Sequence, residues 1–348
     1  HRHFIDHLEI VKEGKSFFRV PYVFDCWFDS GAMPYAQNHY PFENKEVFEN
    51  AFPADFISEG LDQTRGWFYT LTVIAAALFD RPAFRNVIVN GIILAEDGNK
   101  MSKRLNNYPS PKSILDSYGA DALRLYLLHS VVVKAEDLRF SDKGVEGILK
   151  QVLLPLSNVL SFYKIYADLY KFDPKKCPQE SLTYTEMDLW ILSNLYSVVK
   201  KVHSGMDIYN LNAAVEPFVD FIDDLTNWYV RRSRRRFWEA EDSADRRAAF
   251  ATLYEVLFVF CRVIAPFVPF IAEDIFQQLT AGNEEESVHL CDFPQVNETK
   301  ILKDLEQQVC DVREIVGLGH SLRKEHKLKV RQPLANFYII GPRERLEA

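Results

Sequence analysis

The chain has 348 residues, of which 47% are hydrophobic and 26% are charged, and its formal net charge at pH 7 is -8. This length suits two or three globular domains, and the negative charge excludes a protein coated in basic surface, so a nucleic-acid partner would have to meet a local basic patch. No run approaches the ~20 apolar residues needed to span a bilayer. The 5 cysteines are scattered and never spaced as Cys-x-x-Cys, which favours a reducing, cytoplasmic compartment over a disulfide framework or a zinc site.

The first part of the chain predicts an α/β region. Residues 1–60 are irregular and rich in aromatic residues and proline, which indicates loops around a mixed sheet. The segment from Trp67 to Phe79 is apolar nearly all round, as expected for a buried helix beside a sheet. Next, "NVIVNGIIL" matches a buried parallel strand, and "EDGN" a tight connection.

Helical spacing dominates the rest of the chain. In "SPKSILDSYGADALRLYLL", Ser113 and Asp121 are placed to cap successive helices. From about residue 145 apolar residues recur at three-to-four spacing, which predicts a helical bundle. Breaks are predicted near Pro174, Gly205 and Gly282. The stretch "ANFYII", residues 335–340, is predicted to be the first strand of another unit.

A cationic loop follows the predicted parallel strand. "AEDGNKMSKRLNNY" carries Lys100, Lys103 and Arg104 just beyond that strand, where open α/β sheets bind ligands. The chain has neither a Gly-x-x-x-x-Gly-Lys-Ser/Thr loop nor a Gly-x-Gly-x-x-Gly turn, so these cations would act from the side. Their best use is on negative charge that develops during a reaction, such as a departing pyrophosphate. The alternative is a solvated lysine-rich turn.

A second polar cluster lies in "ISEGLDQTRGWF". If this stretch is helical, Glu59, Asp62 and Gln63 share one face and could hold an ammonium group and hydroxyls. In the alternative interpretation, Ser58, Glu59 and Asp62 merely cap a helix N-terminus.

These motifs together carry a family resemblance. "KMSKR" preceded by "NVIVNGIILAEDGN" resembles the signature loop of the class I aminoacyl-tRNA synthetases, and "EGLDQTRGWF" with "DCWFDSGAMPYAQ" is similar to the isoleucine type. "HRHFIDH" and "FDCWFDSGAMPYAQNHYPFENK" are similar to the eukaryotic cytosolic form. The likeness continues through "NWYVRRSRRRFW" and "IAPFVPFIAEDIF", over nearly the whole chain. One departure is Arg104, where many relatives carry Ser, and an arginine can also face phosphate.

The resemblance implies an α/β fold followed by an all-α part. Residues 1–110 would be the second half of a Rossmann-like catalytic domain with the signature lysine loop, and residues 111–150 a connecting helical region that contacts the tRNA stem. Residues 151–325 would be an anticodon-binding helical bundle, and 326–348 the start of a C-terminal unit. None of the 9 histidines lies in a His-Ile-Gly-His-type motif. We therefore expect that motif and an editing domain upstream, and an isolated chain that is inactive.

The resemblance also implies the reaction and the residues that serve it. Isoleucine and ATP, with Mg²⁺ expected and no metal bound by the protein, would give an adenylate whose isoleucyl group is transferred to tRNA(Ile). Lys100 and Lys103 would be catalytic. The residues expected to bind the adenylate are Glu59, Gly60, Asp62, Gln63, Trp27 and Trp67. Those expected to bind ATP are Asn90, Lys100, Met101, Ser102, Lys103 and Arg104. Both tryptophans could equally be ordinary core aromatics.

An arginine run in the helical part points to RNA. "NWYVRRSRRRFWEAEDSADRR" combines arginines with aromatic residues, which suits phosphate contact and base stacking. The alternative is that the arginines pair with the acidic residues that follow them. The resemblance favours RNA, with tRNA binding assigned to Trp228, Arg231, Arg232 and Arg235. A second basic stretch, "RKEHKLKVRQPL", has a weaker claim.

Three other functions stay open. The chain could be a non-catalytic tRNA-binding module, or a stand-alone nucleotidyltransferase that uses "KMSKR" on ATP. It could also come from a valine- or leucine-type synthetase, because one methylene in an apolar pocket gives only modest discrimination between amino acids.

Overall fold

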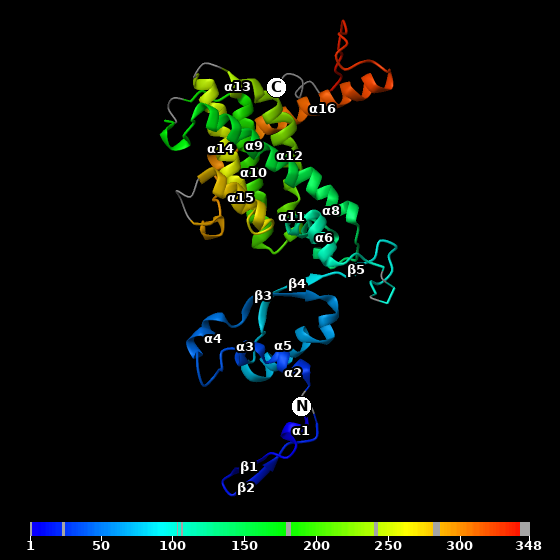
Figure 1. The fold of residues 1–348 in the computed structure, drawn as a ribbon, viewed down its shortest axis with the longest axis vertical. Helices are drawn as coiled ribbons and strands as arrows, with labels where there is room; N and C mark the ends of the chain where they lie inside the picture. The colour runs from blue at the N-terminus through cyan, green and yellow to red at the C-terminus, as the bar shows by residue number, and fades with distance from the viewer. Residues whose placement is uncertain are drawn as a thin grey trace. The chain divides into compact units, whose positions relative to one another are not determined.

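The computed structural model describes residues 2–22, 25–102, 104–105, 107–178, 182–239, 243–280 and 286–341. It divides into two compact units (Figure 1). Residues 1–92 with 134–136 form the N-terminal unit, and residues 93–133 with 137–348 form the bundle unit. Strands and helices mix in the first and helices dominate the second, so the predicted order of α/β followed by all-α is confirmed.

The N-terminal unit begins with a short helix and a hairpin and contains a βαβ arrangement. Its strands are β1 (Glu9–Lys12), β2 (Lys15–Phe18), β3 (Ala54–Gly60) and β4 (Phe84–Asn90). Its helices are α1 (Arg2–Ile5), α2 (Cys26–Gly31), α3 (Met33–Ala36), α4 (Lys45–Ala51), the 3₁₀ helix η1 (Leu61–Arg65) and α5 (Trp67–Phe79).

Strands β3 and β4 pair in parallel, with Ala54 opposite Phe84 and Gly60 opposite Asn90. Parallel neighbours need a crossover connection, and η1 with α5 supplies it. The carboxyl ends of both strands therefore lie at one edge, where ligands bind in open α/β sheets.

Helix α5 is buried on one face only. Phe68, Leu71 and Ala75 pack into the core of this unit, whereas Tyr69 is 60% and Leu78 63% exposed. The prediction of a helix buried all round was therefore wrong for the described residues, in which no second layer covers the outer face. The composition of a helix shows that it is apolar, but it does not show which of its faces other elements cover.

The run "NVIVNGIIL" is interrupted at Gly91. Strand β4 ends at Asn90, and a short strand of the bundle unit, β5 (Ile93–Leu94), pairs in parallel with β6 (Leu138–Arg139). A Cβ atom on Gly91 would lie 1.9 Å from the carbonyl oxygen of Glu136. Glycine is required at this position because two backbone segments touch there.

The bundle unit consists mainly of helices packed around one apolar core. Besides β5 and β6 it contains the helices α6 (Pro111–Tyr118), α7 (Ala120–His129), α8 (Asp142–Ile148), α9 (Leu154–Tyr170), α10 (Glu186–Asp207), α11 (Leu211–Val215), α12 (Pro217–Asp223), α13 (Arg231–Trp238), α14 (Ala244–Ile264), α15 (Pro269–Thr280) and α16 (Lys303–Glu325). Two π-helical segments are η3 (Leu149–Leu153) and η6 (Asp224–Val230). Short 3₁₀ turns are η2 (Val131–Lys134), η4 (Pro174–Lys176), η7 (Val288–Leu290) and η8 (Glu298–Lys300).

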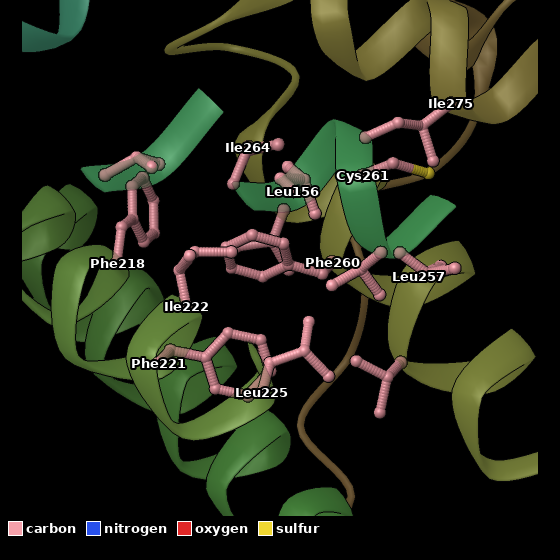
Figure 2. Close-up of a cluster of buried hydrophobic side chains, with 14 of the residues drawn as sticks. Leu156, Phe218, Phe221, Ile222, Leu225, Leu257, Phe260, Cys261, Ile264 and Ile275 are labelled. Atoms are coloured by element: carbon pink, nitrogen blue, oxygen red, sulfur yellow. The ribbon is translucent and has the colours of Figure 1, made fainter. Parts of the chain in front are cut away.

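Phe260 of α14 lies near the middle of that core (Figure 2). Its ring centroid is 5.7 Å from that of Phe218 and 4.8 Å from that of Phe221, both on α12. Leu156 of α9 and Ile275 of α15 belong to the same buried cluster. Burying one side chain of this size contributes roughly 1.5–3 kcal/mol to the stability of the fold. The three-to-four spacing of apolar residues in the sequence correctly predicted this helical bundle.

The helix caps differ from the sequence prediction. Ser110, and not Ser113, caps α6, because the Ser110 Oγ accepts the Ser113 backbone N–H at 3.1 Å. Asp121 lies in the first turn of α7, yet its carboxylate accepts the backbone N–H of Ile271 at 2.7 Å, at the start of α15. The cap is therefore made across the fold between two helices that are distant in sequence.

Two further predictions can be compared with the structure. The break predicted near Gly205 is present, because α10 ends at Asp207 and α11 begins at Leu211. Gly205 itself lies within α10, where an added Cβ would sit 2.9 Å from the backbone nitrogen of Ala214. The segment 335–340 forms no strand among the residues that the structure describes. The predicted break at Gly282 lies outside the described residues, and the domain boundaries assigned from the sequence stay a prediction.

Candidate functional site

The polar cluster of "ISEGLDQTRGWF" is not one helical face. Glu59 and Gly60 end strand β3, whereas Asp62 and Gln63 lie in η1. The helical prediction was wrong because the parallel pairing with β4 holds residue 59 extended up to Gly60. The turn at Gly60 nevertheless leaves Glu59 and Asp62 close in sequence at the carboxyl end of a parallel strand.

Gln63 has a structural task at the start of α5. Its Oε1 accepts the backbone N–H of Trp67 at 3.0 Å, and its Nε2 donates to Asp62 at 3.1 Å. An added Cβ on Gly60 would lie 2.7 Å from the Asp62 Oδ1, so glycine leaves room for that carboxylate. The capping alternative named Ser58, Glu59 and Asp62, but among the described residues the side chain that caps the start of α5 is that of Gln63.

Both predicted tryptophans lie at the N-terminal end of α5. Trp67 is its first residue, and its Nε1 donates to the carbonyl of Ser30 on α2 at 3.0 Å. Trp27 of α2 is 40% exposed, and its indole lies over Gly66, with 3.0 Å between its Cη2 and an added Cβ. An exposed indole beside the strand ends is consistent with a binding wall, whereas a core aromatic would be covered. Asn90 ends β4, opposite Gly60, at the same edge of the strand pair.

The lysine loop belongs to the bundle unit. The predicted tight turn is present: the Gly98 N–H donates to the Ala95 carbonyl at 2.8 Å, and Gly98 has a φ of +83°. Lys100 forms an antiparallel bridge with Leu94, and its side chain is exposed. Arg104 is also exposed. Lys103 lies outside the described residues, so its predicted role stays a prediction.

Two residues of the loop are anchored by their surroundings. Met101 is partly buried and packs against the core of the bundle unit. The Ser102 backbone N–H donates to the Oδ1 of Asn107 at 2.9 Å. A hollow of about 220 Å³ lies beside this segment and is lined in part by Met101, Asn107 and Tyr108.

The arginine run forms α13, and its members divide into two groups. Arg236 points inward and donates to Asp188 and to Asp245. In the part of the chain that the structure describes, no ion pair holds the other four, which are exposed. These four are Arg231, Arg232, Arg234 and Arg235. Among the described residues the pairing alternative is therefore correct for Arg236 alone, because only this member of the run pairs with carboxylates, whereas Arg234 lies over the ring of Phe162.

Two guanidinium groups lie close to the indole ring of Trp228. The guanidinium carbon of Arg232 is 5.4 Å from the centroid of the indole ring, and the guanidinium carbon of Arg313, on α16, is 5.3 Å from it. Arg313 also pairs with Asp223 at 2.8 Å and with Asp224. Sequence reasoning missed Arg313 because 82 positions separate it from Arg231, and only the packing of α16 on the bundle brings them together.

A groove joins these residues. Its volume is about 1010 Å³, and it is lined by side chains of η6, α13 and α16, among them Trp228, Arg231, Arg232, Arg313 and His320. Arginine planes beside an indole are the groups that contact phosphates and stack on unpaired bases. Arg235 is exposed on the same helix but does not line the groove.

Two family models match the chain. Residues 1–139 match "tRNA synthetases class I (I, L, M and V)", and residues 188–339 match "Anticodon-binding domain of tRNA ligase". The chain belongs to the class I aminoacyl-tRNA synthetases. It combines a segment of the catalytic domain of this family with an anticodon-binding domain, as the sequence predicted.

Relatives of this synthetase chain are bacterial ligases. It is 79% identical to the isoleucine--tRNA ligase of Chlamydia pneumoniae over 99% of its length, and 75% identical to that of Chlamydia abortus over 100%. The chain spans 33% of the length of either relative. The expected eukaryotic cytosolic type was therefore wrong. Because a bacterial relative shares most residues of this chain, the motif sequences do not distinguish a bacterial ligase from a eukaryotic cytosolic one.

Two solved synthetase structures share the fold. A LeuRS–tRNA–LeuAMS complex from Agrobacterium radiobacter K84 matches with a TM-score of 0.63 and 20% identity, over 85% of this chain and 36% of that chain. Methionyl-tRNA synthetase of Mycobacterium tuberculosis with methionyl-adenylate matches with a TM-score of 0.60 and 20% identity, over 77% of this chain and 55% of that chain. At this identity the likeness establishes the fold alone.

Two features are absent from the residue ranges that the structure describes. No helix in these ranges is long and apolar enough to cross a membrane. The same ranges contain no group of three or more His, Cys, Asp or Glu side chains that could hold a metal ion.

Proposed function

We propose that the protein containing this chain is an isoleucine--tRNA ligase of the cytoplasm. The observation that carries the proposal is 79% identity over 99% of the chain to a ligase of that name. In the first step an isoleucine carboxylate oxygen attacks the α-phosphorus of ATP, and the bond from that phosphorus to the bridging oxygen breaks, releasing pyrophosphate. In the second step a terminal hydroxyl of tRNA(Ile) attacks the adenylate carbonyl, and AMP leaves.

The N-terminal unit supplies groups suited to the adenylate. The carboxylates of Glu59 and Asp62 match an ammonium group and ribose hydroxyls, and they stand where a parallel strand ends. The exposed indole of Trp27 offers an apolar wall for the isoleucine side chain. We expect Gln63 to contribute less to adenylate binding than its position in the motif implies, because its Oε1 already accepts the backbone N–H that starts α5.

The lysine loop supplies groups suited to the phosphates. Lys100 is exposed beyond a short parallel strand, and a lysine ammonium can follow negative charge as it moves onto the departing pyrophosphate. Mg²⁺ brought by the nucleotide would neutralise part of the triphosphate charge. No acidic cluster among the described residues suits a resident ion, so we expect that ion to be held by the phosphates.

The groove beside α13 supplies groups suited to tRNA. The net charge of the chain is -8, so attraction to RNA has to come from a local basic surface. The exposed arginines of α13 form such a surface, and Trp228 with Arg313 adds planar groups on which a base can stack.

Amino-acid-dependent exchange of pyrophosphate into ATP tests the proposal. The full-length protein that contains this chain should catalyse exchange with isoleucine far better than with valine or leucine. Preference for valine or leucine would assign it to another branch of the family. No exchange with any of the three, combined with specific tRNA binding, would support the tRNA-binding module instead.

A second experiment measures pyrophosphate exchange and tRNA binding by the isolated 348-residue chain. This chain lacks a His-Ile-Gly-His-type motif, so we expect no exchange from it, together with measurable tRNA binding. Robust exchange by the isolated chain would favour a stand-alone nucleotidyltransferase.

A further inference from the structure

The backbone on either side of Lys100 is held at several points. On its N-terminal side, the Ala95 N–H donates to the Asn99 carbonyl at 2.9 Å, and the Asp97 Oδ1 accepts the Asn99 N–H at 2.9 Å. Lys100 itself bridges to Leu94. The turn before the lysine is therefore closed on itself and tied to β5.

Asn107 closes the other side of the segment. Its Oδ1 accepts the Ser102 N–H at 2.9 Å, and its Nδ2 donates to the Lys100 carbonyl at 3.2 Å. One amide thus bonds to the backbone on both sides of Met101. The Leu105 N–H adds a bond to the Ser102 carbonyl at 3.1 Å, which ties the chain after Ser102 to the same clamp.

The clamp needs an amide at this position. Asparagine carries a donor and an acceptor on one planar group, so it can satisfy an N–H and a C=O at once. An aspartate would keep the acceptor but would set a carboxylate oxygen against the Lys100 carbonyl. An alanine would remove both bonds. Both bonds join the Asn107 side chain to backbone atoms of Ser102 and Lys100, so the clamp acts on the path of the backbone and leaves the lysine ammonium free of it.

We propose that Asn107 is a positioning residue that holds the Lys100–Ser102 backbone so that the loop presents Lys100 to the phosphates of ATP during activation. The inference rests on the proposed function, because it presumes that the loop acts on ATP. Met101 anchors the segment in the core from one side and Asn107 from the other. A loop fixed before substrate arrives loses less conformational freedom in the transition state.

The test uses Asn107→Ala and Asn107→Asp in the full-length protein. Two ordinary hydrogen bonds are together equivalent to about a tenfold change in the population of the held conformation. We expect the turnover number of isoleucine-dependent exchange to fall about tenfold or more in both variants. The dissociation constant for isoleucine, and the single-turnover transfer of a preformed adenylate to tRNA, should stay within about twofold of the unmodified protein.

Asn297→Ala is the matched control. The Asn297 side chain also makes two hydrogen bonds to nearby residues: as the N-cap of η8, its Oδ1 accepts the Thr299 N–H at 3.2 Å and the Thr299 hydroxyl at 2.7 Å. This variant should match Asn107→Ala in melting temperature and keep full exchange.

The possible results distinguish a failure of the proposed role of Asn107 from a failure of the proposed ligase function. Exchange by Asn107→Ala at the unmodified rate would overturn the clamp while leaving the proposed ligase intact. Equal losses of exchange and transfer, with a melting temperature well below that of the control, would assign Asn107 a purely structural role. Absence of isoleucine-dependent exchange in the unmodified protein would overturn the proposed function itself.

Discussion

The guanidinium of Arg236 donates two hydrogen bonds, each 2.8 Å long, to the two carboxylate oxygens of Asp188. Asp188 is fully buried at the start of α10 and also accepts the hydroxyl of Tyr229 at 2.7 Å. This pair fastens α13 to α10. Arg236 therefore stabilises the fold, whereas the other arginines of α13 are exposed.

Replacing Arg236 should therefore damage the fold, and replacing its neighbour should not. Arg236→Ala leaves a buried carboxylate without its partner, which costs about 3–5 kcal/mol of unfolding free energy. Arg235→Ala removes an exposed side chain and should change that free energy by less than about 0.5 kcal/mol. Urea denaturation followed by circular dichroism measures both. Equal stabilities would show that the pair does not hold the helix.

The same pair predicts how stability depends on pH. Burial by itself raises the pKa of Asp188, but the hydrogen bonds and charge of Arg236 outweigh burial, so the pKa lies below its usual range. A lowered folded pKa gives stability that is present above the unfolded value of about 3.9 and is lost as pH falls through the folded value.

Asp188→Asn should accordingly lower stability at neutral pH and weaken the loss of stability below about pH 4. Urea denaturation at a series of pH values measures the slope. A variant whose slope equals that of the unmodified chain would place the acid sensitivity on other carboxylates, of which Glu306 is a candidate because its pKa is also lowered. There too burial raises the pKa, and the hydrogen bond from Lys303 leads the opposing contributions.

The exposed arginines should govern the salt dependence of tRNA binding. Each phosphate contact contributes about one unit to the slope of log affinity against log salt concentration. Replacing Arg231 and Arg235 together with Ala should weaken binding and flatten the slope by about two units, without affecting amino-acid activation by the full-length protein. Filter binding over a salt series checks this.

Arg85→Ala is a suitable control for the tRNA experiment, because Arg85 is exposed in the N-terminal unit and pairs with Asp55 at 3.4 Å. It should leave the slope unchanged. If the double variant also kept its slope, the RNA contact would have to be sought elsewhere, first at Lys327 and Lys329.

The adenylate cluster should divide into binding and capping residues. Glu59→Gln and Asp62→Asn keep size but remove charge, so they should weaken binding of a non-hydrolysable isoleucyl-adenylate analogue and barely change the melting temperature. Gln63→Ala removes the cap of α5 and should cost about 1 kcal/mol of unfolding free energy. Calorimetric titration and thermal denaturation of the full-length protein measure the two effects. If the Glu59 and Asp62 variants lose stability but keep affinity, both residues are structural.

Lys103→Ala in the full-length protein should lower the rate of isoleucine activation by roughly 10²–10³-fold, as removal of an oxyanion-type donor does. The affinity for isoleucine should barely change, because the charge that this lysine would meet develops only during reaction. Lys112→Ala, an exposed lysine of α6, should have no effect. A large loss of isoleucine affinity with normal turnover would contradict the role given to Lys103.

The sequence by itself determined the order of an α/β part and a helical part, the tight turn before the lysine loop, and the family. Each of these depends on features that are local or carried by a contiguous motif. The β-branched run that includes Val87 and Ile88 formed a parallel strand, and the three-to-four spacing of α10 formed a helix. Turn chemistry is equally local, because Gly98 alone supplies the positive φ that the connection requires.

Only the tertiary structure decided which side chains meet. Asp121 looks like a cap for its own helix, but it caps α15, because a carboxylate accepts whichever backbone N–H the packing brings near. Gly205 lies near the end of α10, as predicted, but only the packing shows that it makes room for α11. The five arginines of α13 are alike in sequence, and the bundle alone made Arg236 structural and added Arg313 to the groove beside Trp228. Hydrogen bonds and close contacts act over a few ångströms, so partners that are distant in sequence are settled only once the chain has folded.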